Sequence, residues 1–519
     1  MPPTGRSTIS WLRAAAALAV GAGLLAGAAG RAAADPSDLA AAVPTPKLEW
    51  TDCGGGFQCA TATVPRDYGD RRGPTFRLPV IKWPAKDQSR RIGSMFVNPG
   101  GPGGSGVGFL RGAPPGALDT FARFDVVSWD PRGIAGSVPA VDCSTPEEDN
   151  ASPSTTFTPL FELDLKAAVR SARDSVRTCA ERNPGILPYL GTANSARDLD
   201  LLRRAVGDEK LTYLGMSYGA HIGATYASLF PGRARALLLD SPVDPDVWTN
   251  RPFEMRREQN ASFENSLDRF FASGGFPEDG FDDLVAAMNR APLPAPHAQH
   301  PDSVRGDDVL RVATHAMYAR YDWTLLSKAL REAAAGDASF MRDLLDYYTG
   351  RAPDGTYQAT ASYYAVTAQD HRLPRDVQDY VGDARHSYAM FPHQWMYAFG
   401  QDLVYAVYDQ PQKDVFRGPF RNPAGAAPVL VIAGTHDPAT PYQWGRRMVE
   451  QLGNARLLTY KADGHVAATD FNPCIGAAML TYLDTAALPA EGASCTQSAP
   501  AAAASLTGGA PRWLVPRER

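Results

Sequence analysis

Short apolar and β-branched runs alternate with helical patterns along the first half of the chain. These runs predict strands at 60–65, 75–83, 94–97, 124–129, 211–214 and 234–240. The segment 160–206 predicts helices, with an amphipathic pattern around residues 199–202. Strands that alternate with helices at this spacing are typical of βαβ units. We therefore expect an α/β fold with a mostly parallel central sheet.

The pattern changes after the sixth of these strands. Residues 245–425 contain few strand-like runs and many helical patterns that carry Phe, Tyr, Trp and Met. Strand patterns return at 428–434 and 455–460, and residues 473–488 predict a closing helix. This shift predicts a large, mainly helical insertion within one sheet-based core.

The first residues predict a secretory signal peptide. Arg6 and Arg13 give a positive start, residues 14–30 form an apolar run, and Ala32–Ala34 fits a small-residue cleavage site. The alternative is a membrane anchor, which the short, Gly-rich run disfavours. No later stretch is long and apolar enough to span a bilayer. We expect a secreted, extracellular protein.

The domain boundaries follow from these shifts in pattern. We predict a signal peptide at 1–34, a first core part at 35–244, a helical insertion at 245–425, a second core part at 426–496 and a disordered tail at 497–519. Within the first core part, the Ala/Pro-rich residues 35–50 predict an extended lead-in.

Six cysteines in a chain with a predicted signal peptide indicate disulfides rather than free thiols. They are Cys53, Cys59, Cys143, Cys179, Cys474 and Cys495. Fifteen pairings are possible. We favour the sequential pairs 53–59, 143–179 and 474–495, because each pair is local and flanked by loop-forming residues.

Charge and composition narrow the range of partners. The formal net charge is −5, with no basic run, so nothing indicates a nucleic acid or an anionic membrane as partner. No Cys/His cluster has the spacing of metal ligands, and we expect neither a metal nor an organic cofactor. A monomer is favoured.

The segment 215–219 has the pattern Gly-x-Ser-x-Gly directly after a predicted strand and before small residues that can begin a helix. A nucleophile elbow needs this order, with small residues two positions on either side of the serine, so that the turn can lift the hydroxyl above the sheet edge. The five-residue pattern alone also occurs by chance in Gly-rich chains. The strand before it favours Ser217 as a nucleophile.

A serine hydroxyl needs a base that is itself oriented by a carboxylate. Each of the two late strand patterns is followed by one of these groups, and we predict Asp437 as the orienting acid and His465 as the general base. Asp463 is a rival acid, but it lies two residues from His465 on the same loop. His436 is a rival base, but it neighbours Asp437, whose partner must come from another loop.

A Gly-rich segment, 98–106, follows the predicted strand at 94–97. Backbone N–H groups of such a loop and of the residue after the nucleophile can bind an oxyanion. We predict Tyr218 and Gly101 as the two donors, with Gly100 as the near alternative to Gly101. A Gly-rich loop also suggests phosphate binding, but no Gly-Lys-Ser/Thr follows it.

Five segments in this order resemble the secreted tripeptidyl aminopeptidases of actinomycetes, which are related to the proline iminopeptidases. The segments are 98–106, 130–133, 215–219, 434–441 and 463–465. The resemblance covers essentially the whole mature chain. It implies an α/β-hydrolase fold whose cap is the helical insertion. Two features depart from the pattern: proline iminopeptidases usually have His where Pro99 stands, and residues 365–370 lack the cysteines often found there in secreted relatives.

The resemblance implies a secreted serine exopeptidase that acts on peptides with a free N-terminus and releases a short peptide, for which a tripeptide is the favoured length. The catalytic set would be Ser217, Asp437 and His465, with an acyl-enzyme intermediate. An esterase or lipase and a proline iminopeptidase-like hydrolase share this set and are the alternatives. A binding protein on an inactive scaffold is disfavoured, because all three residues are intact.

An exopeptidase of this kind needs an anionic subsite for the ammonium group of its substrate. Glu254, Glu258 and Glu264 lie on one predicted helix of the insertion, where the first two share a face. Asp370 is a further candidate. A solvated acidic helix face is the simpler interpretation, so none of these residues is assigned.

Overall fold

The structure is a computed structural model that describes residues 36–498 except 115, 146, 147, 149–157, 358–360 and 396–401. The predicted signal peptide at 1–34 and nearly all of the predicted tail lie outside the described residues.

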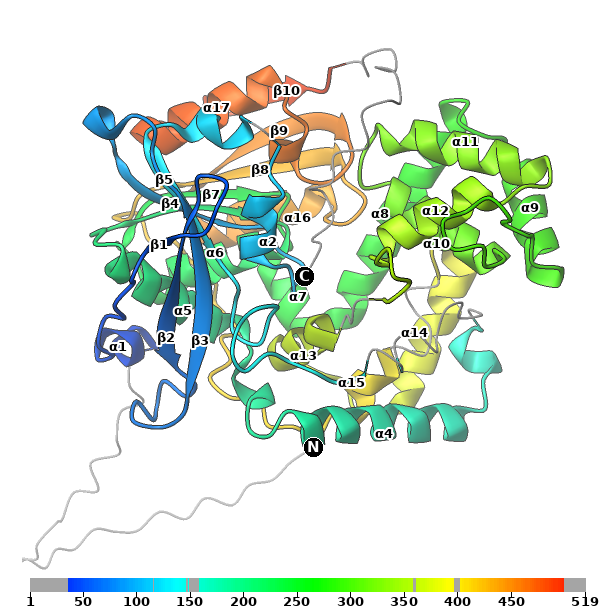
Figure 1. Cartoon of the computed structure of the whole chain (residues 1–519), viewed down its shortest axis with the longest axis horizontal. Helices are drawn as coiled ribbons and strands as arrows, with labels where there is room; N and C mark the ends of the chain where they lie inside the picture. The colour runs from blue at the N-terminus through cyan, green and yellow to red at the C-terminus, as the bar shows by residue number, and fades with distance from the viewer. Residues whose placement is uncertain are drawn as a thin grey trace, which may run out of the picture. The chain divides into compact units, whose positions relative to one another are not determined.

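Ten strands form one sheet in the order β1-β2-β3-β5-β4-β6-β7-β8-β9-β10 (Figure 1). They are β1 (Thr51–Asp52), β2 (Gln58–Pro65), β3 (Thr75–Trp83), β4 (Gly93–Asn98), β5 (Phe124–Trp129), β6 (Leu211–Met216), β7 (Ala234–Asp240), β8 (Val429–His436), β9 (Ala455–Asp463) and β10 (Ser494–Thr496). The pairs among β1, β2, β3 and β5 are antiparallel, and the pairs from β5 to β10 are parallel. The mostly parallel sheet is confirmed, and the short edge strands β1 and β10 are additions to the predicted strands.

Helices cover both faces of the sheet, so the central strands are buried on both sides and consist of continuous apolar runs. Successive side chains point to opposite faces. Tyr213 of β6 therefore packs in the cluster formed with α5, α6 and α16, and Leu214 packs in the cluster with α2 and α17. These helices are α2 (Gly106–Arg111), α5 (Thr192–Ala205), α6 (Tyr218–Leu229), α16 (Tyr442–Leu452) and α17 (Pro473–Thr485).

The described segment between β7 and β8 is mainly helical, as its sequence predicts (Figure 1). Its helices are α7 (Pro245–Asn250), α8 (Pro252–Ala272), α9 (Glu278–Arg290), α10 (Gly306–Ala316), α11 (Asp322–Ala334), α12 (Ser339–Tyr348), α13 (Ala361–Asp370), α14 (Val377–Met390) and α15 (Leu403–Val407). Helices α8 to α12 enclose a hydrophobic cluster of their own, which includes Phe263, Leu267 and Trp323. This cluster makes the cap a packed body and not a loose set of surface helices.

One helix that precedes the nucleophile in sequence packs with the cap. Helix α4 (Leu165–Arg182) buries Ala172 and Val176 in a cluster that also contains Tyr380 of α14 and Leu403 of α15. Its apolar stripe needs a partner surface, and the late cap helices supply it. The sequence pattern predicted this helix but not its partner.

The lead-in is not extended throughout, and that expectation was wrong for its first residues. Helix α1 (Pro36–Ala41) begins the described chain. Ala40 and Val43 are buried in the main core, and the Arg204 guanidinium donates to the carbonyl oxygens of both residues. Burial of two small apolar side chains and these hydrogen bonds bring the segment onto α5.

The structure contains the disulfides Cys53–Cys59, Cys143–Cys179 and Cys474–Cys495, which is the sequential pairing. The last of them joins α17 to β10, the edge strand of the sheet. Among the described helices, none combines the length and the apolar character that a membrane crossing requires.

Candidate active site

Ser217 stands between the end of β6 and the start of α6 in a backbone conformation with a φ of 56°. L-residues rarely adopt positive φ, and a sharp strand-to-helix turn imposes it. A Cβ on Gly219 would lie 2.5 Å from the carbonyl oxygen of Asn98, and a Cβ on Gly215 would collide with the backbone of Gly219. The small residues on either side of Ser217 are therefore required by close backbone approach.

His465 and Asp437 lie together at the carboxyl ends of β9 and β8. The Nδ1 atom of His465 is 2.9 Å from each carboxylate oxygen of Asp437. The Asp437 side chain is fully buried, and its Oδ1 accepts the backbone N–H groups of Ala439 (3.0 Å) and Thr440 (2.8 Å). The carboxylate is thus held by its own loop, with its charge directed at the imidazole.

The cap also contacts the loop that carries His465. The His465 backbone N–H donates to the carbonyl oxygen of Tyr318 (2.8 Å), and the Tyr318 ring meets the imidazole edge-on at 5.5 Å. Ala319 forms an antiparallel bridge with Gly464. Cap residues therefore hold the backbone of the predicted base.

The two rival residues are differently placed. The Asp463 carboxylate is 2.5 Å from Nε of Arg269 and 3.7 Å from Nε of Arg320, so it forms ion pairs with two arginines of the cap. His436 is the last residue of β8, and burial lowers the pKa of its imidazole. The structure pairs His465 with Asp437, and it directs Asp463 to the cap.

Strand β7, which lies between β6 and β8, ties the serine turn to the histidine loop. The N–H of Ser217 donates to the carbonyl oxygen of Asp240 (2.9 Å), whose carboxylate accepts the N–H of Ala468 (2.7 Å). The Ser241 hydroxyl accepts the N–H of Val466 (3.0 Å). Burial raises the pKa of the Asp240 carboxyl to about 6. Sequence reasoning missed these two residues, although an acid at the end of a buried strand was a usable signal.

The Gly-rich loop lies against the serine turn. A Cβ on Gly100 would be 2.5 Å from the carbonyl oxygen of Met216 and 2.9 Å from the N atom of Tyr218. The Gly100 N–H already donates to the Asn98 side chain (3.0 Å). In the part of the chain that the structure describes, the N–H groups of Gly101 and Tyr218 have no hydrogen-bond partner. This difference favours Gly101 over Gly100 as a donor to a substrate.

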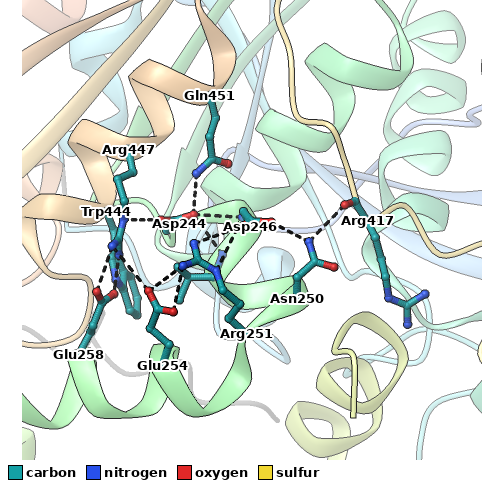
Figure 2. A network of polar contacts seen from close by, with 11 residues as sticks. Asp244, Asp246, Asn250, Arg251, Glu254, Glu258, Arg417, Trp444, Arg447 and Gln451 are labelled. Atoms are coloured by element: carbon teal, nitrogen blue, oxygen red, sulfur yellow. Dashed lines mark hydrogen bonds and ion pairs between the residues drawn. The ribbon is translucent and has the colours of Figure 1, made fainter. Parts of the chain in front are cut away.

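Two candidate carboxylates for the substrate ammonium are engaged at the root of the cap (Figure 2). Glu258 pairs with Arg447 of α16, with an Oε1–Nη1 distance of 3.0 Å. Glu254 accepts from Arg251 at 2.8 Å. Arg447 also pairs with the fully buried Asp244 at 2.6 Å. These contacts fasten α7 and α8 to the core, and they occupy both glutamates.

The other two candidates are also engaged. Glu264 is 2.6 Å from Nδ1 of His393 within the cap. Asp370 accepts hydrogen bonds from Thr192. None of the four carboxylates is a ready partner for an ammonium group. In the described residues, no group of three or more His, Cys, Asp or Glu side chains is arranged to hold a metal ion.

A serine elbow at the carboxyl edge of a mostly parallel sheet, with a histidine and an acid on later loops, defines an α/β-hydrolase. Comparison with known proteins agrees: a family model described as TAP-like protein matches residues 398–495. The tripeptidyl aminopeptidase of Streptomyces coelicolor is 30% identical, over 87% of this chain and 86% of its own. The chain belongs to the tripeptidyl aminopeptidase family of α/β-hydrolases and is a serine hydrolase.

Two other relatives have different names. The serine protease Hip1 of Mycobacterium tuberculosis is 29% identical, over 86% of this chain and 91% of its own. Carboxylesterase B of the same species is 32% identical, over 88% of this chain and 91% of its own. Similar identity thus extends to proteins named for peptide and for ester hydrolysis, and the choice of substrate needs a separate argument.

Proposed function

We propose that the protein is a secreted serine exopeptidase that cleaves a peptide bond near a free N-terminus and releases tripeptides. Ser217 is the nucleophile, His465 the general base and Asp437 the acid that orients the imidazole. The observation that carries the proposal is the placement of His465 Nδ1 at 2.9 Å from both oxygens of a carboxylate whose own position is held by two backbone N–H groups.

The reaction would proceed in two half-reactions. His465 Nε2 takes the hydroxyl proton as Ser217 Oγ attacks the scissile carbonyl, and then gives that proton to the leaving amine. Backbone N–H groups of Gly101 and Tyr218 stabilise the oxyanion. Water, deprotonated by the same imidazole, then attacks the acyl-enzyme, which releases the peptide acid and restores Ser217. Asp437 favours the tautomer with the proton on Nδ1, so that Nε2 is free to accept.

The names of the relatives support a peptide substrate and also provide the second candidate, a carboxylesterase. The two are separated by a direct comparison of an N-terminally free tripeptide amide, its acetylated form and a short acyl ester. We expect turnover of the free amide, loss of turnover on acetylation, and release of the intact tripeptide by mass spectrometry. Preference for the ester with no effect of acetylation would refute the exopeptidase.

A Ser217→Ala variant provides the control for the same assay. It should remain folded by circular dichroism, lose turnover and lose labelling by a fluorophosphonate. Labelling that persists in this variant would show that the nucleophile is elsewhere.

The proposal of secretion rests on the sequence of residues 1–34, and the three disulfides are compatible with an oxidising compartment. Expression of the full chain in an actinomycete host should place the protein in the culture medium with Asp35 as its first residue, as read by N-terminal sequencing. Retention of the full chain in the cell pellet would contradict it.

A further inference from the structure

A buried chain of hydroxyl and carboxyl groups joins the cap to the residue that follows the nucleophile. The Tyr218 hydroxyl makes a short hydrogen bond with Oγ1 of Thr192 at the start of α5. Thr192 Oγ1 donates to Oδ2 of Asp370 (2.6 Å), and Thr192 N–H donates to Oδ1 (2.8 Å). All three residues are buried. The mechanism above uses only the backbone of Tyr218 and leaves this chain without a role.

The direction of the chain follows from the number of donors and acceptors. A threonine hydroxyl has one proton, so Thr192 that donates to an ionised Asp370 must accept from Tyr218. Burial raises the pKa of Asp370 to about 6, against the hydrogen bonds from Thr192 and Trp248 that favour the ionised form. With Asp370 ionised, the Tyr218 hydroxyl therefore donates to Thr192.

Helix α13, which ends at Asp370, reaches the Gly-rich loop with its other end. A Cβ on Gly103 would lie 2.8 Å from the hydroxyl of Ser362 and 3.5 Å from the N atom of Tyr363, so this turn of the loop rests directly on the start of the helix. One cap helix therefore touches the loop of one predicted oxyanion donor and, through Thr192, the side chain of the other.

We propose that Thr192 and Asp370 are positioning residues for the oxyanion hole, and that α13 aligns its two donors with each other. The inference rests on the proposed function, because it presupposes that Gly101 and Tyr218 supply those donors. Both residues act through Tyr218, the first residue of α6. A misplaced donor weakens stabilisation of the transition state more than binding of the ground state, so the effect belongs in kcat rather than KM.

The test uses Thr192→Val in the full mature chain, with Thr192→Ser as the conservative variant that keeps the hydroxyl. We expect Thr192→Val to lower kcat on the tripeptide amide about tenfold with KM within twofold of wild type, which is less than the ~10²-fold loss of a whole donor. Thr192→Ser should restore kcat to within about threefold of wild type. The rate of fluorophosphonate labelling should fall in parallel with kcat, since the phosphonyl oxygen occupies the same hole.

Loss of a buried hydroxyl can also act by lowering stability, and Thr314→Val in α10 is the matched control. Thr314 is buried in the cap, and its hydroxyl lies within hydrogen-bond distance of the Leu310 carbonyl oxygen (3.0 Å) and of Gln394 Oε1 (2.9 Å), so its removal should lower the midpoint of thermal unfolding with kcat unchanged. Should Thr192→Val fail to fold, Asp370→Asn replaces it: an amide cannot accept both Thr192 donors on its two ends. The same selective loss of kcat is expected.

Each outcome is decisive. A Thr192→Val enzyme with wild-type kcat and labelling rate overturns the inference, provided that Ser217→Ala is not labelled. The inference is also overturned if Thr314→Val loses as much kcat as Thr192→Val, or if Thr192→Val raises KM and leaves kcat unchanged. Labelling that survives Ser217→Ala overturns the proposed function instead, so the two failures are distinguishable.

Discussion

Replacement of Asp437 by Asn removes a charge and leaves the shape of the side chain unchanged. Oδ1 of the native residue accepts two backbone N–H groups, from Ala439 and Thr440, and in the variant the amide oxygen must take that place. The amide NH₂ then faces Nδ1 of His465, which in the native protein is 2.9 Å from both oxygens. Because NH₂ is a donor, this contact favours an Nδ1 that accepts, with the imidazole proton on Nε2, although the amide oxygen and the Thr440 hydroxyl also lie within reach of Nδ1. A protonated Nε2 cannot take a proton from Ser217.

The size of the effect follows from the alternatives open to the amide. If the amide group rotates by 180°, its oxygen faces His465 and the tautomer with the proton on Nδ1 returns. The two backbone N–H groups then lose their acceptor, at a cost of about 1 kcal/mol each. A cost of about 2 kcal/mol corresponds to an active fraction of about one in thirty. If the amide does not turn, the loss is that of a wrong tautomer, about 10⁴-fold in kcat. We therefore expect Asp437→Asn to lower kcat between about 30-fold and 10⁴-fold.

The assay is kcat on the tripeptide amide together with the rate of fluorophosphonate labelling. Asp463→Asn is the control, since it removes the rival acid and the partly exposed ion pairs with Arg269 and Arg320, each worth about 1 kcal/mol or less. It should change kcat less than threefold. A decrease below tenfold for Asp437→Asn, or a larger decrease for Asp463→Asn, would refute the reasoning.

Three further results are expected. Gly219→Ala places a Cβ against the Asn98 carbonyl and should lower the free energy of unfolding by about 1–3 kcal/mol in urea; an unchanged midpoint contradicts the tight elbow. Burial lowers the pKa of His393, but its two carboxylate partners outweigh burial and raise the pKa to about 9. The stabilisation of the fold by protonated His393 is therefore complete below about pH 6.5 and is lost as the pH rises through 9. Parallel pH–stability curves for His393→Gln and wild type would exclude this contribution. Arg447→Ala removes the cationic partner of the buried Asp244, whose Oδ1 keeps neutral donors such as Gln451. This change should lower the free energy of unfolding by about 3 kcal/mol, against under 1 kcal/mol for the exposed Arg251→Ala. Equal costs would contradict the difference in burial.

The fold and the positions of the candidate catalytic residues were within reach of sequence reasoning. Buried parallel strands are continuous apolar runs, and in this class of fold the reactive groups follow such runs directly. Ser217, Asp437 and His465 each stand at a strand end that the pattern located. Locating a strand end is a local problem, because it depends on a few consecutive residues.

Contacts between distant segments were not within reach. The pairing of Glu258 with Arg447 joins residues 189 positions apart, and that of Asp370 with Thr192 joins residues 178 positions apart. The sequence offered Glu258 and Asp370 as possible ligands for a substrate amine. Only the packing of the cap on the core shows that other groups of the chain already occupy them.

The sequence by itself determined the order of strands and helices, the serine elbow and the residues that follow the late strands, since each depends on local propensity and on the apolar period of a short segment. The tertiary structure alone decided which carboxylates are engaged, that α4 packs with the cap, and that α13 contacts both the Gly-rich loop and Thr192. The physical reason is that charge pairing and the burial of a helix face depend on which surfaces meet, and that is a property of the whole chain.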